Sequence, residues 1–235
     1  GETLPVPMCL DAIGTAASAA GERADTLSLL HTAAQQCLKS SRFTKKQIGL
    51  LLFAGVYRTD FVTEPAIAAR VAGDLKMNDL CSPDAPHKTL ALDVFNGAVG
   101  FLNSCYLVSE LARAGCVQQA MIVTAEVENN ADVDPDHLLG LCEMGSAVLL
   151  HESDDGETGF QAFSFDYFQE HDDALRVHVT WNERGRPYLV ASRAARWHEI
   201  YLDCIEQSVS RFLDQQQVSR EEIRVLLPPQ ISPTF

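Results

Sequence analysis

Long hydrophobic runs are missing from this chain of 235 residues. No apolar segment approaches the roughly 20 residues that cross a bilayer, and no basic stretch followed by a short apolar core resembles a signal peptide. The sequence therefore predicts no membrane span. A hydrophobic fraction of 46% and a charged fraction of 21% are ordinary for a globular protein. The length suffices for one large domain or two small ones.

Positive charge is scarce. Lys and Arg together number 18 against 32 Asp and Glu, which gives a formal net charge of −14 at pH 7. Nonspecific nucleic-acid binding depends on Lys and Arg contacts to phosphates. We therefore expect no nucleic-acid partner.

Paired cysteine motifs are absent as well. The seven cysteines are odd in number and widely scattered, and no two of them form C-x-x-C. A zinc site or a redox dithiol is therefore not expected. Most of the cysteines fall within apolar patterns, as small buried side chains do. We expect no bound metal and a reduced, cytoplasmic setting.

Apolar segments alternate along the chain with segments of helical pattern. The sequence predicts helices over residues 24–40, 64–75, 98–114 and 194–216, a short helical piece near 134–141, and strands over 48–56, 88–95, 119–127, 146–151, 159–168 and 222–227. Pro65 suits the first turn of its helix. Continuous apolar strands between helices are typical of a sheet covered on both faces, so the predicted class is α/β.

Residues 88–115, KTLALDVFNGAVGFLNSCYLVSELARAG, form the most informative segment. A strand is predicted to end at Asn96-Gly97-Ala98, and the helix that follows is apolar nearly all round, which is typical of a helix buried in a large domain. The first turn of such a helix presents free backbone N–H groups and a positive dipole end. A thiol placed there would have a lowered pKa.

This segment resembles the nucleophile motif of the thiolase superfamily, above all its ketoacyl-ACP synthase III branch. The family pattern is close to D-V-N-A-A-C-x-G-F, with the catalytic cysteine at the start of the helix. Asp93, Val94, Gly100 and Phe101 match that pattern, and Ala98 stands where the cysteine is expected. The resemblance implies a condensing enzyme or acyltransferase whose substrate is an acyl-CoA or acyl-ACP thioester, with no other cofactor. An alanine cannot attack that thioester.

The resemblance also indicates a histidine position and a candidate base. Pro229 stands where the family pattern P-H-Q-A-N has its histidine, within residues 227–232. Residues 58–66 resemble the loop that crosses the dimer interface, where relatives that join two acyl chains use a glutamate as base. Glu64 is therefore a candidate base in a partner's site, or else a carboxylate stabilised by a helix dipole. Dimerisation through residues 88–95 is expected.

Further candidate substrate contacts lie on both sides of this region. Asn96, next to Ala98, is either a substrate contact or a turn amide. His171 and His178 lie where the family has a lid or a tunnel lining, so one of them could replace the missing base. A structural role for both histidines is the alternative.

Trp181 and Arg184 are candidates for contact with CoA. Together with Arg186, these two side chains could flank the adenine and a phosphate of CoA. The alternative is a solvated hairpin whose turn lies at residues 182–185, NERG.

A repeated pattern predicts an internal duplication. Residues 43–52 and 218–227 both place an apolar residue and a hydroxyl residue before a charged turn, an isoleucine and an apolar strand. The thiolase fold is built from two similar halves stacked in five layers, αβαβα. We therefore predict a first half over residues 1–156, without its opening strand, and an incomplete second half over 157–235.

Three interpretations of function stay open. The first is a condensing protein or acyltransferase of fatty-acid, polyketide or secondary metabolism that works without a covalent cysteine step. The second is a catalytically silent subunit that pairs with an active ketosynthase homologue. The third is an engineered Cys-to-Ala substrate trap. The first and third predict a homodimer and the second a heterodimer.

Overall fold

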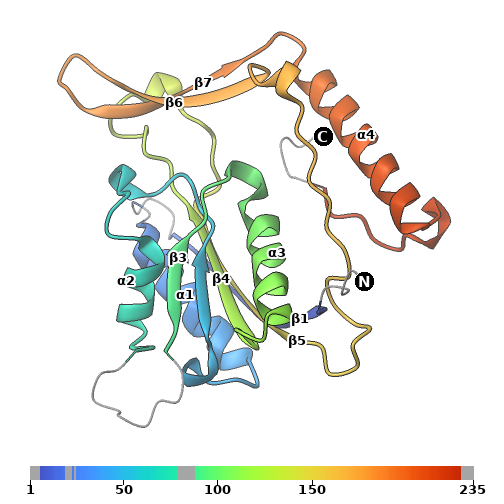
Figure 1. The fold of residues 1–235 in the computed structure, drawn as a ribbon. Helices are drawn as coiled ribbons and strands as arrows, with labels where there is room; N and C mark the ends of the chain where they lie inside the picture. Colours follow the sequence, from blue (N-terminus) through green and yellow to red (C-terminus); the bar gives the residue numbers. More distant parts are fainter. Residues whose placement is uncertain (1–5, 19–22, 24, 79–87, 229–235) are drawn as a thin grey trace.

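A computed structural model describes residues 6–18, 23, 25–78 and 88–228. Short 3-10 turns join the longer elements (Figure 1). In chain order these elements are β1 (Met8–Ala17), α1 (Thr26–Ser40), β2 (Leu50–Phe53), α2 (Ile67–Asp74), β3 (Leu90–Asp93), α3 (Gly100–Arg113), β4 (Gln119–Glu126), β5 (Met144–Glu152), β6 (Leu175–Trp181), β7 (Pro187–Arg193) and α4 (Trp197–Gln216).

The main sheet has five strands in the order β1-β5-β4-β2-β3. β2 pairs in parallel with both β3 and β4, whereas β5 runs antiparallel to β4 and to β1. Helices α1 and α2 cover one face of this sheet and α3 covers the other (Figure 1). The predicted α/β class and the sheet covered on both faces are confirmed.

The side chains of β2 show why this strand is apolar without interruption. Leu51 and Phe53 pack into the core beneath α1 and α2, and Leu50 and Leu52 pack into the core beneath α3. Successive side chains of a strand point to opposite faces, and both faces here are covered. All four side chains are fully buried.

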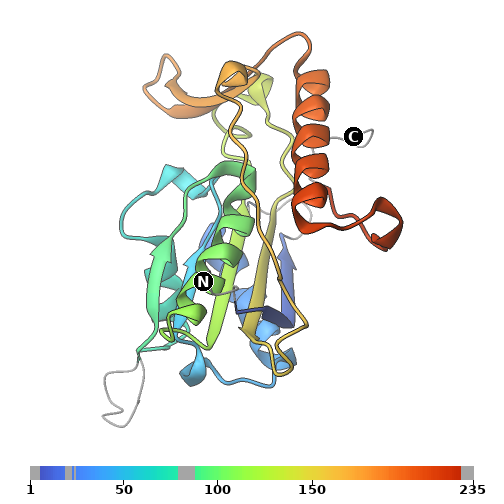
Figure 2. The same cartoon turned by 45° about the vertical axis from the view of Figure 1, so that its right-hand side comes forward.

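The later part of the chain stands beside and above this sheet. An extended segment leads from β5 along the side of α3 to the antiparallel β6–β7 hairpin, and α4 follows the hairpin (Figure 2). The hairpin turn at residues 182–185 is confirmed. α4 contributes no buried residue in the described part of the chain. The predicted division at residue 156 stays a prediction.

Three sequence predictions about strands are wrong. The first half does have an opening strand, because β1 lies at the edge of the sheet. Residues 159–168 form no strand, since their only bridge to another segment joins Phe160 to Met8. Residues 222–227 are exposed and also form no strand. Both predicted segments have strand-like composition, but neither has a neighbouring strand to pair with along its length.

Two helix predictions need smaller corrections. α2 begins at Ile67, so Pro65 precedes the helix instead of occupying its first turn. The short helical piece near 134–141 is a single 3-10 turn at Pro135–His137. Among the described residues, no helix is long and apolar enough to cross a membrane. The described His, Cys, Asp and Glu residues form no group of three or more that could hold a metal ion.

Candidate functional site

The junction between β3 and α3 carries the residue that replaces the expected cysteine. Ala98 lies in a 3-10 turn, Gly97–Val99, directly before α3. Gly97 has φ of +49°, a left-handed conformation that favours glycine. A Cβ atom at Gly100 would lie 2.9 Å from the carbonyl oxygen of Ala54, so the motif glycine allows α3 to approach the end of β2.

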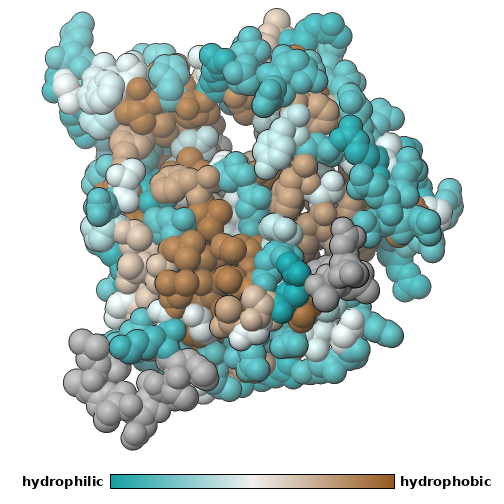
Figure 3. Space-filling model, viewed as in Figure 1, coloured by the Kyte–Doolittle hydropathy of each residue, from teal (hydrophilic) through white to brown (hydrophobic). Residues whose placement is uncertain are grey.

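The expectation that Ala98 opens a fully buried helix is wrong. Ala98 is exposed, and α3 buries only the face that includes Ser104, Cys105 and Val108. On the opposite face Leu102 is 47% exposed. The extended segment after β5 contacts this apolar face at Tyr106, yet Leu102 stays about half exposed, and Figure 3 shows hydrophobic side chains gathered over β3 and α3.

A cavity of about 400 Å³ lies next to this junction. Asn96 and Val99, on either side of Ala98 along the chain, both contribute to its wall. Most of the wall is aromatic or aliphatic, and it combines α3, the extended segment after β5 and α4. Its lining residues are Asn96, Val99, Leu102, Phe160, Ala162, Phe163, Ser164, Phe165, Asp166, Tyr167, Ser208, Val209 and Phe212.

Aromatic packing fixes one wall of this cavity. The ring of Tyr106 on α3 contacts the rings of Phe163 and Phe165 edge-on, with centroid separations of 5.6 and 5.5 Å. Phe160 stacks on Phe163 at 5.9 Å. These contacts attach the extended segment to α3. The same aromatic residues lie in the segment that was predicted as a strand, and their sequence pattern did not reveal that they line a cavity.

The motif aspartate has a structural role that the sequence did not reveal. Asp93 Oδ2 lies 2.9 Å from Nη1 of Arg58, and these side chains are 8% and 2% exposed. Asp93 also accepts hydrogen bonds from the backbone N–H groups of Ile67 and Ala68, at 3.0 and 2.9 Å. The carboxylate therefore caps α2 and is a favourable charge at its N-terminus.

Arg58 connects this pair to the candidate site. Its guanidinium carbon lies 4.7 Å from the ring centroid of Phe53 and 4.0 Å from that of Phe95. Phe95 immediately precedes Asn96, so the cation–π contact holds the chain that leads into the junction. The available sequence signal was an arginine after one buried strand and an aspartate at the end of another. Because β2 and β3 are parallel, their carboxyl ends meet.

Glu64 lies just before α2 and is exposed. The first turn of α2 is occupied by the carboxylate of Asp93, not by that of Glu64. The dipole interpretation of Glu64 therefore finds no support in these hydrogen bonds and stays a prediction. A role as a base in a partner's site stays a prediction.

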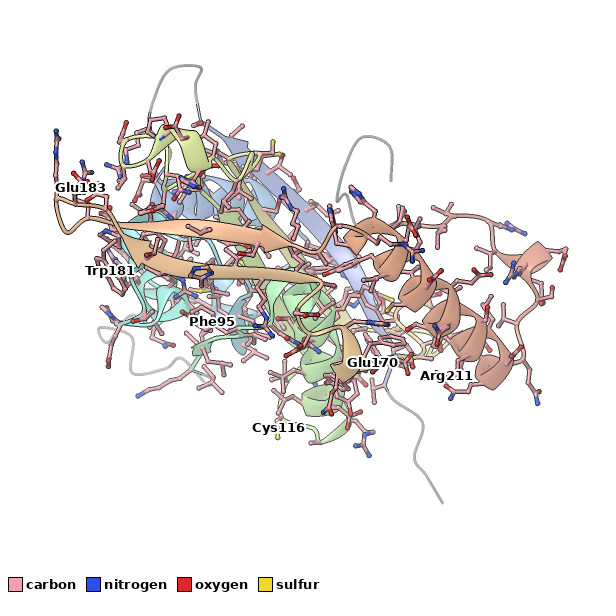
Figure 4. All side chains as sticks on the ribbon, turned by 90° about the horizontal axis from the view of Figure 1, so that it is seen from above. Phe95, Cys116, Glu170, Trp181, Glu183 and Arg211 are labelled. Atoms are coloured by element: carbon pink, nitrogen blue, oxygen red, sulfur yellow. The ribbon has the colours of Figure 1, made fainter. Side chains whose placement is uncertain are left out.

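The structure brings Asn96, alone among the other candidate residues, to the cavity. Its amide also donates a hydrogen bond to Asn103 Oδ1. His171 ends a 3-10 turn, and the exposed His178 lies on β6. Trp181, which is 65% exposed, lies at the far end of the hairpin (Figure 4). Arg184 lies in the turn that follows β6. Pro229 lies outside the described residues.

Burial affects the pKa of two titratable groups near the junction. Desolvation raises the pKa of Glu126, at the end of β4, although hydrogen bonds from the N–H groups of Val56 and Tyr57 oppose that shift. Burial raises the pKa of the Cys105 thiol on α3 to about 12. Cys105 therefore remains a thiol at neutral pH and is no substitute for a nucleophile at residue 98. Neither side chain lines the cavity.

No family model matches the sequence, and no curated protein matches it. Solved structures do share its fold. FabH, the 3-oxoacyl-(acyl carrier protein) synthase III of Xanthomonas oryzae, has a TM-score of 0.75 and 15% identity, over 99% of this chain and 80% of that one. A variant of OleA from Xanthomonas campestris has a TM-score of 0.74 and 14% identity, over 100% and 80%.

A second OleA structure, a cysteine-to-serine variant with bound lauric acid and lauroyl-CoA, has a TM-score of 0.66 and 15% identity, over 94% of this chain and 75% of that one. At such identities the likeness establishes the fold. The predicted thiolase-like fold of the ketoacyl-ACP synthase III type is therefore confirmed.

Proposed function

We propose that this protein binds acyl-CoA or acyl-ACP thioesters as a condensing-type protein without an acyl-cysteine step at residue 98. The observation that carries the proposal is the apolar cavity of about 400 Å³ whose wall includes Asn96, which precedes the turn, and Val99, which directly follows Ala98. Small-molecule sites are typically apolar and about 300–1,000 Å³ in volume, with few polar groups. The shared fold supports acyl thioesters as the ligand class. The proposal places this role in the cytoplasm, in fatty-acid, polyketide or secondary metabolism.

Calorimetric titration of the intact protein with dodecanoyl-CoA tests the binding step. We expect saturable binding that Ser208→Trp weakens at least about tenfold, because the indole would fill the cavity from α4. Gln207→Trp is the matched control, since Gln207 is exposed on the same helix and does not line the cavity. Equal binding by both variants would place the acyl chain elsewhere.

Restoring a thiol at the junction tests the chemistry. We expect Ala98→Cys to form a dodecanoyl thioester on incubation with dodecanoyl-CoA, because the N-terminal end of α3 favours the thiolate. Ala114→Cys, an exposed position at the opposite end of α3, should form none. Mass spectrometry of the intact protein measures the adduct, and an adduct on both variants or on neither contradicts the proposal. Condensation restored by Ala98→Cys would support the engineered-trap interpretation.

A silent-partner role is the second candidate, and the exposure of the junction favours it. Ala98 is exposed, and the nearby side chains of Phe95 and Val99 are 55% and 44% exposed. An active partner subunit would cover such a surface. Glu64 of this chain would then serve as a base in the active site of that partner. A purified ketosynthase III-type homologue should then form a heteromer with this protein and lose activity when Glu64→Gln is supplied. Unchanged turnover with this variant would exclude the role of Glu64.

A further inference from the structure

Aromatic side chains line the cavity from two elements. Phe160, Phe163, Phe165 and Tyr167 line it from the extended segment after β5, and Phe212 lines it from α4. The extended segment passes between α3 and α4 (Figure 1), so aromatic side chains of the segment and of α4 border the same space. Aromatic lining is common in sites for small ligands, and it favours some ligands over others of the same size.

Two of these aromatic side chains have no aromatic neighbour. The three phenylalanines of the extended segment are already engaged with one another or with Tyr106. Tyr167 and Phe212 line the cavity, yet neither contacts another aromatic ring in the part of the chain that the structure describes. Phe212 is half-buried and Tyr167 is 79% exposed, so both side chains keep surface that a ligand in the cavity reaches.

A ligand with an aromatic ring gains more from such a wall than a saturated ligand of the same size. Aromatic pairs in offset-stacked or edge-to-face arrangements gain free energy beyond the apolar area that they bury. A saturated ring buries at least as much apolar area but has no π-system, so only burial of that area favours it. A straight acyl chain must also lose the freedom of several rotatable bonds on binding, whereas an aromatic ring is already rigid.

We propose that this cavity selects thioesters of acids that carry an aromatic ring, with the ring of the acyl group packed against Phe212 and Tyr167. The inference rests on the proposed function and names a substrate class within it. Phe212 is accordingly a specificity-determining residue, because it brings an aromatic ring without an aromatic partner to the cavity from α4. The selectivity requires binding alone and involves no covalent step.

Two matched thioesters separate aromatic recognition from hydrophobic binding. 3-Phenylpropanoyl-CoA and 3-cyclohexylpropanoyl-CoA differ only in whether the six-membered ring is aromatic or saturated. Calorimetric titration of the intact protein should show about fivefold tighter binding of the phenyl compound. A wall that acts through apolar area alone would bind the cyclohexyl compound at least as tightly. Equal affinities, or a preference for the cyclohexyl compound, would overturn the inference, whatever any variant does.

Phe212→Leu tests whether the ring binds in this cavity. Leucine keeps an apolar side chain on α4 but removes its ring, so the preference for the phenyl compound should fall to about twofold or less. Phe168→Leu is the matched control, because Phe168 directly follows Tyr167 along the chain but does not line the cavity. This control should keep the fivefold preference. A fivefold preference that persists in Phe212→Leu would overturn the inference, since the ring would then bind elsewhere.

The two proposals fail in different ways. If dodecanoyl-CoA and both ring-bearing thioesters fail to bind, the proposed function is wrong and this selectivity is wrong with it. If dodecanoyl-CoA binds but the two ring-bearing thioesters bind equally, only the aromatic selectivity is wrong.

Discussion

At the scale of single residues, the buried ion pair between Arg58 and Asp93 has a clear consequence for stability. Removing one partner of a buried pair leaves an uncompensated charge, at a cost of about 3–5 kcal/mol. Asp93→Ala also removes the cap of α2. We therefore expect a loss of at least about 3 kcal/mol in the free energy of unfolding, measured by urea denaturation.

The matched control for Asp93→Ala is Asp172→Ala. Asp172 forms an ion pair with Arg176 in which the side chains are 70% and 58% exposed. Exposed pairs of this kind contribute about 0–1 kcal/mol. If both variants lost the same small amount, the pair between Arg58 and Asp93 would not be the buried link between β2, β3 and α2 that the structure shows.

The buried thiol on α3 predicts a pH dependence of stability. The Cys105 pKa is about 12 in the folded protein against an ordinary value of 9.0, so the folded state retains a proton that the unfolded state loses. This contribution to stability is complete below pH 9.0 and is lost as the pH rises toward 12. Cys105→Ala should therefore lose less stability than the unmodified protein between about pH 8 and 10.5.

Thermal unfolding followed at several pH values measures this difference. The alanine variant has a cavity at every pH, which lowers its stability by a constant amount. The slope with pH, not the absolute stability, is thus the informative quantity. Parallel curves for the two proteins would show that the thiol titrates normally in the folded state.

At the scale of elements, apolar sequence patterns identified segments that pair with other strands along their length. β2 and residues 120–123 of β4 are apolar without interruption because both faces of these strands are covered. β1 was missed because Asp11 and Gly14 interrupt its apolar pattern, and a register shift lies between Leu10 and Ala12. Residues 8–17 form a strand because they pair with β5. Because β5 lies far along the chain, the sequence around residues 8–17 does not reveal this pairing.

The candidate site was predicted to a similar extent. The motif located the junction at Ala98, and Asn96 does line the cavity. The ion pairs of Arg58 and Asp166 were missed, because each depends on a partner from another element. The guanidinium of Arg58 meets the end of β3, and the carboxylate of Asp166 meets α4. The exposure of Ala98 also could not be predicted, since it depends on what covers the outer face of α3.

Helix α4 should be among the least protected elements of the isolated chain. It contributes no buried residue, whereas α3 buries Cys105 and Val108 completely. Elements with few buried contacts open at a lower free energy than core elements. Hydrogen exchange should therefore show protection factors in α4 at least about tenfold below those in α3. Equal protection would mean that another surface covers α4 in solution.

At the scale of the whole molecule, the free edge of β3 predicts self-association. β3 pairs only with β2 among the described strands. Leu90, the first residue of β3, and Phe95, two residues beyond its end, are 57% and 55% exposed. A free strand edge beside apolar side chains is a template for pairing with another chain. We expect a dimer through this edge, and we expect Leu90→Arg to raise its dissociation constant at least about tenfold, because a guanidinium would be buried without a partner.

The opposite edge of the same sheet supplies the control for this prediction. β1 pairs only with β5 among the described strands, and Leu10 on β1 is 51% exposed, close to the value for Leu90. Leu10→Arg therefore adds the same charge to a comparable edge, and the dimer should persist in sedimentation at micromolar concentration. Dissociation by Leu10→Arg alone would place the interface at β1. A monomeric unmodified protein would instead leave Glu64 without a partner's site to enter, and a role within the same chain would have to replace the proposed one.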